Sequence, residues 1–230
     1  MPFPRAQPDV AICRGAFRAL LCLVCLACLP GCPSAINHRV KEINDDGVFL
    51  FSKGDYRHAR ESFELALTLT PQDAGLVYNL AQCSDRLGDN VRAEQYYTQC
   101  LELDPRHGQA RHAYAALLYR LGRSAEANRM IDDWLAKEPT LADAHAIQGW
   151  RLRQQRAYPE ALERLQHALS IDPGNRLALT QLGVLYEETN MPERALVLYE
   201  RVLSRHPDES DLTARVRELK THGVKTPQPD

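Results

Sequence analysis

Three cysteines near the start of the sequence have a spacing that suits metal ligands. Cys22, Cys25 and Cys28 are each separated by two residues, an interval at which neighbouring thiolates can bind one zinc ion. The same cysteines lie inside the apolar run of residues 19–29, ALLCLVCLACL. Within such a run, cysteine serves as a small hydrophobic residue. We therefore interpret them as part of an apolar segment and predict no metal site there.

The residues around that run are typical of a signal peptide. Arg5, Arg14 and Arg18 give the preceding residues a positive charge. A membrane-spanning helix needs about 20 apolar residues, whereas the core of a secretory signal has roughly 7–15. The run in this sequence falls in the second class. We therefore expect residues 1–31 to be a signal peptide and not part of the folded domain.

The end of the run resembles a bacterial lipoprotein box. In Leu29-Pro30-Gly31-Cys32, a branched apolar residue and a small residue precede a cysteine. The resemblance implies cleavage before Cys32 and lipidation of that cysteine by palmitate-like acyl chains. Each buried methylene group contributes about 0.8 kcal/mol, so two or more chains anchor a protein stably.

The alternative is an ordinary secretory signal, cut by the general signal peptidase. That enzyme favours an A-x-A-like site, and residues 26–32 contain none. Residue 33 is proline and not the aspartate that marks retention in the inner membrane. We therefore expect a lipid-anchored protein of the cell envelope, on the periplasmic side of the outer membrane rather than at the inner membrane.

No other pattern in the sequence supports catalysis. There is no H-E-x-x-H, G-x-S-x-G, Walker A or G-x-G-x-x-G motif, and these are the short motifs with a known mechanism. The eight histidines are dispersed, and no carboxylate pair stands out as an acid and a base. We predict no catalytic residue, no cofactor and no metal, and therefore no enzyme.

The charge pattern argues against a nucleic acid partner. The formal net charge is −2, and it becomes −4 without residues 1–31, because three arginines and one aspartate are lost. Nucleic acid binding needs clustered basic residues. Here lysine and arginine alternate with acidic residues, as on a solvated surface. The oligomeric state is not predicted.

Two cysteines besides Cys32 remain beyond the apolar run. Cys83 and Cys100 would lie in an oxidising compartment if the chain is exported. They form either a disulfide or two buried thiols, and the sequence favours the thiols without excluding the disulfide.

Prolines recur at an interval of 34 residues through most of the chain. An alanine stands twelve residues before each proline, a large apolar residue eight before and a leucine four before. The prolines are Pro71, Pro105, Pro139, Pro173 and Pro207. Five copies in register, without insertion, indicate stacked copies of one helical unit.

These columns resemble the tetratricopeptide repeat (TPR) family. The resemblance covers 170 of the 230 residues, as repeats 40–73, 74–107, 108–141, 142–175 and 176–209. The small residue at repeat position 8 is Gly47, Ala81, Ala115, Gly149 or Gly183, and the turn position 15 is Gly54, Gly88, Gly122, Arg156 or Asn190. The aromatic residue usual at position 4 is missing. The resemblance implies an all-α fold, a right-handed superhelical solenoid of five helix–turn–helix repeats.

The ends of the solenoid need their own elements. We expect residues 32–39 to be a tether, residues 210–220 a capping helix and residues 221–230 a disordered tail. Leu212, Val216 and Leu219 are spaced to face inward from the cap. Trp134 stands where the family usually has alanine, and we expect its ring to pack in the core.

The resemblance also implies where a partner binds. In TPR proteins the first helix of each repeat lines a concave groove, and Tyr, Trp and Arg are enriched at binding hot spots. Some members clamp a terminal carboxylate with five residues from three successive repeats, of which only Asn79 matches in place, so this clamp is not predicted for the first three repeats. The expected groove residues, with Trp150 and Asn79 foremost, are Phe51, Tyr78, Asn79, Gln82, Arg86, His112, Tyr119, Arg120, Trp150 and Arg153.

Together these features predict a lipid-anchored scaffold that binds a protein or an extended peptide. Anchor, size and repeat number are similar to those of TPR lipoproteins of pilus assembly, so an envelope, pilus or secretion complex is the expected setting. The alternative is a regulator or activator of a cell-wall enzyme, or a carrier of a small ligand. The partner and the pathway are not predicted.

Overall fold

The computed structural model describes residues 33–226, and every regular element within this range is an α-helix. The expected signal peptide and Cys32 lie outside the described residues. The helices are α2 (Pro33–Ser52), α3 (Tyr56–Leu69), α4 (Ala74–Arg86), α5 (Asn90–Leu103), α6 (Gly108–Arg120), α7 (Ser124–Lys137), α8 (Ala142–Gln154), α9 (Tyr158–Ile171), α10 (Arg176–Glu188), α11 (Pro192–Leu203) and α12 (Ser210–Thr221).

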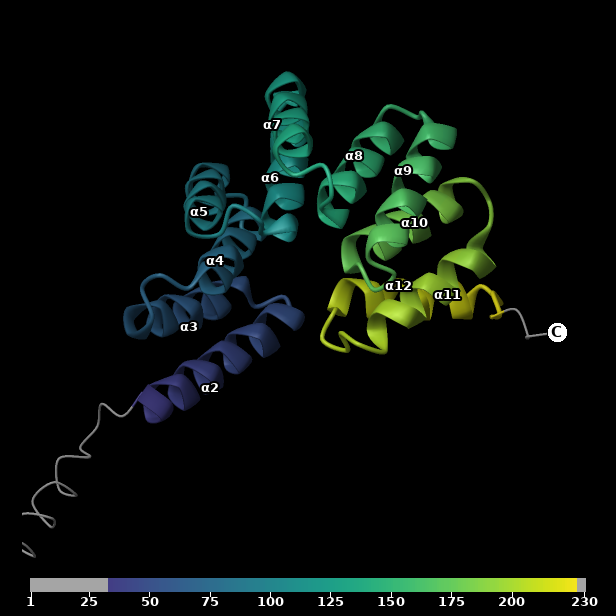
Figure 1. The fold of residues 1–230 in the computed structure, drawn as a ribbon. Coiled ribbons are helices and arrows are strands. Elements are labelled where there is room, and N and C mark those ends of the chain that lie inside the picture. Colours follow the sequence, from purple (N-terminus) through teal and green to yellow (C-terminus); the bar gives the residue numbers. More distant parts are fainter. Residues whose placement is uncertain (1–32, 227–230) are drawn as a thin grey trace, which may run out of the picture.

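Successive helices form hairpins that follow one another in a curved row (Figure 1). Helices α4, α6, α8 and α10 begin 34 residues apart, as the proline spacing predicted. The prediction of an all-α superhelical solenoid is confirmed. The row curves so strongly that α2, near its start, and the residues just before α12, at its end, line the same cavity.

A column of large side chains fills the space between the helices of each hairpin. It consists of Phe63, Tyr97, Ile131, Leu165 and Tyr199, each at most 1% exposed. The small residue at position 8 lies directly against this column. A Cβ atom on Gly149 would lie 2.6 Å from Cγ of Leu165, closer than two carbon atoms can approach. The size of the residue at position 8 and that of the facing large side chain therefore limit each other.

The turn between the two helices of each repeat needs a left-handed residue at position 15. Glycine supplies it in the first three repeats, where Gly54, Gly88 and Gly122 have φ values of 80°, 78° and 75°. The last two repeats reach the same conformation with Arg156 (φ 60°) and Asn190 (φ 59°). A residue with a side chain is strained there, although asparagine tolerates it better than arginine.

We therefore expect the substitution Arg156→Gly to stabilise the protein. It relieves a left-handed conformation that costs about 1–2 kcal/mol, offset in part by the larger entropy of glycine in the unfolded chain, about 0.5–1 kcal/mol. The free energy of unfolding in urea should rise by roughly 0.5–1 kcal/mol. The matched change Gly122→Arg, in the third repeat, should lower it by a similar amount. A loss of stability in Arg156→Gly would contradict this account of the turn.

Both ends of the solenoid differ from the expected tether and tail. Helix α2 already begins at Pro33, so residues 33–39 are helical, because Ile36 and Val40 pack against the first core cluster and proline is well suited to a helix start. At the other end, Val224 contacts the last core cluster, and its N–H donates to the Leu219 carbonyl (3.1 Å). The expectation of an extended tether therefore does not hold for residues 33–39, nor that of disorder for residues 221–224. Residues 227–230 lie outside the described range.

Helix α12 closes the last repeat with an apolar stripe. Leu212, Val216 and Leu219 are 6%, 8% and 9% exposed and pack in one cluster with residues of α11. The remaining positions of α12 are mostly charged, so its outer side is solvated.

Candidate functional site

The concave side of the solenoid encloses a cavity of about 1030 Å³. Its walls come from α2, α4, α6 and α10, the first helices of four repeats, and from the segment 205–212 that leads into α12. A volume of this size is large for a small-molecule pocket. Its walls come from several repeats, a length that suits an extended chain.

Six of the ten residues expected in the groove line this cavity. They are Phe51, Tyr78, Asn79, Gln82, Arg86 and His112. The other four, Tyr119, Arg120, Trp150 and Arg153, do not line it. The division does not follow the repeats, because His112 lines the cavity while Tyr119 and Arg120 of the same helix α6 do not, and helix α8 contributes no residue to the cavity wall.

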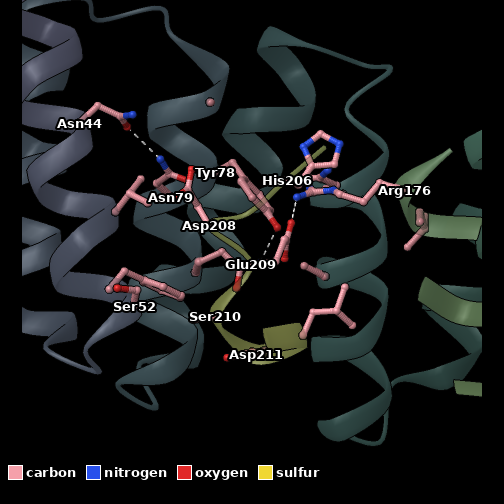
Figure 2. A pocket seen from close by; sticks show the side chains of 18 of the residues that line it. Asn44, Ser52, Tyr78, Asn79, Arg176, His206, Asp208, Glu209, Ser210 and Asp211 are labelled. Carbon is pink, nitrogen blue, oxygen red and sulfur yellow. Dashed lines mark hydrogen bonds and ion pairs between the residues drawn. The ribbon is translucent and has the colours of Figure 1, made fainter. Parts of the chain in front are cut away.

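Amide side chains form a polar strip on the cavity wall. Asn79 of α4 donates from Nδ2 to Oδ1 of Asn44 on α2, at 3.1 Å, and the two point toward one another across the repeats (Figure 2). One turn further along α4, Gln82 donates from Nε2 to the Tyr78 hydroxyl at 2.8 Å. Each amide keeps further donor or acceptor capacity, which can serve the backbone of a bound peptide.

The Tyr78 ring is held between two aromatic groups. Its centroid lies 6.4 Å from the Tyr97 ring and 4.9 Å from the imidazole of His107. His107 is fixed in turn, because its Nδ1 accepts from the backbone N–H of Ala110 at the start of α6. Burial raises the pKa of the Tyr78 hydroxyl and lowers that of His107, so both present uncharged groups to the cavity at neutral pH.

Two arginines carry positive charge into the cavity from opposite sides. Arg86 ends α4 and forms an ion pair with Asp211, while Arg176 begins α10 and forms one with Glu209. Pairs with exposed partners such as Asp211 contribute about 0–1 kcal/mol. Sequence comparison with the family's groove positions found Arg86 but missed Arg176, because Arg176 is the first residue of its repeat and not a groove position.

Trp150 belongs to the core and not to the groove wall. It is 4% exposed, and its ring meets the edges of His112 and Tyr119, each with centroids 5.1 Å apart. The Tyr119 hydroxyl donates to Oδ1 of Asn128 at 2.6 Å. The expectation that Trp150 is foremost in ligand contact is therefore corrected: neighbouring repeats bring these rings together and leave Trp150 buried.

The two remaining arginines of the expected set join neighbouring repeats. Arg120 of α6 pairs with Asp85 of α4, and Arg153 of α8 pairs with Glu188 of α10 at 2.5 Å. Arg120 thus links its helix to the first helix of the preceding repeat, whereas Arg153 links its helix to that of the following repeat. Their guanidinium groups stabilise the stacking of first helices.

His112 on the cavity wall is uncharged in the folded protein. Burial lowers the pKa of this imidazole to about 4, and the charge of Arg153 acts in the same direction. Its Nε2 lies 3.4 Å from Nε2 of Gln181 on α10. The first cause is desolvation, since the Trp150 ring lies against it.

This pKa predicts a loss of stability in acid. Below pH 6.5 the unfolded chain protonates His112 while the folded chain does not, so the free energy of unfolding falls as pH drops from about 6.5 to 4. We expect the decrease between pH 7 and pH 4.5, measured by urea unfolding, to be on the order of 2 kcal/mol smaller in His112→Gln. His107 and His145 shift in the same direction and remain in both proteins. Equal pH dependence of the two proteins would contradict the buried, neutral state of His112.

Cys83 and Cys100 are two free thiols, both fully buried. The Cys100 thiol donates to the Ala74 carbonyl at 3.2 Å. Burial raises the pKa of each thiol to about 12, so neither is a ready nucleophile. The alternative of a disulfide is not the state seen in the structure.

Trp134 packs in the core, as the sequence predicted, at 4% exposed. The guanidinium carbon of Arg111 lies 4.4 Å from the centre of its ring. Both line a second, smaller cavity of about 670 Å³, whose walls come from α6, α7, Glu138 and Pro105 and share no residue with the first cavity.

Within residues 33–226, no group of three or more His, Cys, Asp or Glu side chains is placed to hold a metal ion. No helix in that part of the chain has the length and apolarity that crossing a bilayer requires.

A curved row of helical hairpins, with a groove lined by the first helices of four of them, defines a helical-repeat scaffold for protein interactions. Family models described as tetratricopeptide repeat match residues 50–107, 86–150 and 152–221. The chain belongs to the tetratricopeptide repeat family, as its proline and alanine columns predicted.

Relatives share the repeats within much larger proteins. Human protein O-mannosyl-transferase TMTC3 is 28% identical over 166 residues, 70% of this chain and 18% of the relative. Cellulose synthase operon protein C of Xanthomonas axonopodis pv. citri is 26% identical over 168 residues, 70% of this chain and 11% of the relative. The chain therefore spans less than a fifth of these relatives, and the match concerns the repeats.

A solved structure shows the same fold. A thermophilic TPR protein from Thermus thermophilus superposes with a TM-score of 0.56 at 24% identity, over 79% of this chain and 99% of that protein. At this identity the likeness concerns the arrangement of helices alone.

Proposed function

We propose that the chain is a lipid-anchored scaffold of the cell envelope, which holds a protein or an extended peptide in its concave groove. Its role in this proposal is assembly of an envelope, pilus or secretion complex. The observation that carries the binding part is the amide strip of Asn44, Asn79 and Gln82 inside a cavity of about 1030 Å³. Membership of a family of interaction scaffolds supports the same role.

The amide strip suits an extended backbone for a geometric reason. Asn44 and Asn79 come from the first helices of neighbouring repeats, and Gln82 follows Asn79 by one helical turn. A peptide backbone has one donor and one acceptor per residue, and an amide side chain can meet both. The Phe51 and Tyr78 rings beside the strip offer apolar contacts to alternate side chains.

Affinity purification with matched variants tests this binding site. The full chain is tagged at its carboxyl end, cross-linked lightly in cells and purified from the envelope fraction. We expect Asn79→Ala/Gln82→Ala to reduce recovery of the bound partner at least tenfold. The control Leu65→Ala/Val91→Ala changes two exposed residues of second helices, 52% and 69% exposed, and should leave recovery unchanged. Equal recovery by all three proteins would contradict binding in the groove.

The anchor in this proposal is Cys32. It rests on the charged and apolar segment before that cysteine and on the Leu-Pro-Gly-Cys sequence. Helix α2 begins at the next residue, Pro33, which would hold the first repeat close to the membrane surface. Fractionation of the full chain should show a shift from membrane to soluble fraction in Cys32→Ser. A mature amino terminus that mass spectrometry finds unacylated would contradict the anchor.

A further inference from the structure

The segment that leads into α12 crosses the groove of the first repeats. Residues 205–212 line the same cavity as side chains of α2, α4 and α6. Figure 2 shows Asp208 and Glu209 lying opposite Asn79 and Tyr78, with Asp211 below them. The chain's own loop therefore occupies the place where an extended partner would lie.

Carboxylates make the contacts between this loop and the groove. Asp211 pairs with Arg86 on α4, and Glu209 pairs with Arg176 on α10. Arg86 also lies over the Phe51 ring, with its guanidinium carbon 5.8 Å from the ring centre. The loop is thus held at two points, by two acidic side chains that are two positions apart.

Charge on the two sides of the cavity is complementary. The loop carries three of the four acidic residues that line it, and the fourth is Asp73 at the start of α4. The opposite walls carry Lys41, Arg86 and Arg176, while Arg205 of the segment itself and Arg215 of α12 also line the cavity. Lys41 already pairs with Asp45 on its own helix, which leaves the two arginines to the loop.

The acidic residues near the two arginines have other partners. Asp85, beside Arg86, pairs with Arg120, and Asp143, near Arg176, accepts from Nδ2 of Asn175 at 2.6 Å. The loop carboxylates are therefore the ion-pair partners that the described structure records for Arg86 and Arg176. If the loop moved away, both guanidinium groups would present unpaired charge to the groove.

The Asp211 contact of this segment is exposed, whereas Leu212 at its end is buried against α11. The side chains of Asp211 and Arg86 are 68% and 39% exposed, and exposed ion pairs contribute little to stability. Burial of Arg176 lowers its pKa without neutralising it, so it gains from a carboxylate partner. A carboxylate of another chain can therefore replace that of Asp211 at small cost.

We propose that the groove binds an extended acidic segment of a partner protein, with the pattern acid–x–acid, and that residues 205–212 cover the site in its absence. Side chains two positions apart in an extended peptide point to the same side, so both carboxylates can face the two arginines that now pair with Glu209, the residue before α12, and with Asp211 in its first turn. This inference rests on the proposed function, because it names the chemistry of the partner in the same groove.

The test uses a fluorescein-labelled peptide with the sequence of residues 205–212, RHPDESDL, and the purified full chain. Its matched control peptide has amides in place of the three carboxylates. The variant Glu209→Gln/Asp211→Asn frees the groove without changing either arginine. We expect the acidic peptide to bind this variant at least ten times more tightly than the unchanged chain, by fluorescence anisotropy, and to bind it more weakly as salt rises.

Two further measurements test the role of the two arginines and the displacement of the segment 205–212. Adding Arg86→Gln and Arg176→Gln to the loop variant should remove the preference for the acidic peptide, while a thermal midpoint within a few degrees shows that the fold is kept. Hydrogen exchange in residues 205–210 should rise in the loop variant. Equal affinity for the acidic and the amide peptide would overturn the acidic specificity, and equal affinity of the two proteins would overturn the covering role. A dimer that the loop variant dissociates would also overturn it, because the loop would then pair with a second copy.

Failure of this inference is distinct from failure of the proposed function. A partner recovered through Asn79 and Gln82, with no preference for acidic peptides, would leave the groove as the binding site and reject its acidic chemistry. If Asn79→Ala/Gln82→Ala recovers the partner as well as the unchanged chain, and no acidic preference is seen, the groove is not the binding site.

Discussion

Replacing Trp150 with alanine is expected to lower the free energy of unfolding by about 3–5 kcal/mol, the usual cost of deleting a large buried side chain. The ring is 4% exposed and lies between His112 and Tyr119. Its removal leaves a cavity between the third and fourth repeats that the helices cannot close. Urea unfolding followed by circular dichroism measures the change.

The matched control for Trp150 is Asn79→Ala. The Asn79 side chain is partly exposed and makes one hydrogen bond, to Asn44, so its loss should cost roughly 1 kcal/mol or less. Partner binding should respond in the opposite order, with Asn79→Ala losing affinity while remaining folded. A Trp150→Ala protein that is as stable as the unchanged chain yet fails to bind would show that the ring belongs to the groove after all.

Replacing Gly149 with alanine is the second large effect, with an expected loss of about 1–3 kcal/mol from overpacking. The added Cβ would lie 2.6 Å from Cγ of Leu165 and 3.3 Å from the carbonyl oxygen of Ala161. Leu165 is fully buried and the carbonyl belongs to the backbone of α9, so neither can move aside easily. The loss appears although alanine favours a helix over glycine by about 1 kcal/mol.

Gly75→Ala is the control for that substitution. Gly75 lies in the first turn of α4, is exposed, and its added Cβ would meet only the Asp73 carboxylate at 3.1 Å. Stability should stay constant or rise by up to about 1 kcal/mol. If both substitutions change the unfolding midpoint equally, the close approach at position 8 is not what the repeat requires.

The repeat columns could be predicted from the sequence because each has a local physical cause. Gly149 is small because a helix lies against it, and Gly88 is glycine because the turn is left-handed. Pro173 follows the end of α9 because a helix cannot continue through it. Such causes recur every 34 residues, and the recurrence makes them visible.

The site was predicted less well because it depends on the angle between successive repeats, summed along the whole solenoid. Small rotations between successive hairpins bring Arg86 and Asp211 together, although 125 residues separate them. No local pattern records that closure, so Arg176 and the loop were missed. The same curvature buries Trp150. Its position in the repeat alone would place it in the groove.

The helical start of α2 shows a similar limit. Residues 33–39 lie before the first repeat boundary, and the family pattern says nothing about them. Ile36 and Val40 nevertheless continue the apolar face of α2 toward the first core cluster. Their spacing of four residues is the signal that could have extended the helix.

The groove as the site of partner binding is tested most directly by cross-linking at single positions. A photoreactive amino acid replaces Asn79 in the groove or Leu65 on the outer side of α3, in the full chain within envelope membranes. The account predicts a covalent adduct with one partner at position 79 and none at position 65. An adduct at position 65 with none at position 79 would contradict it.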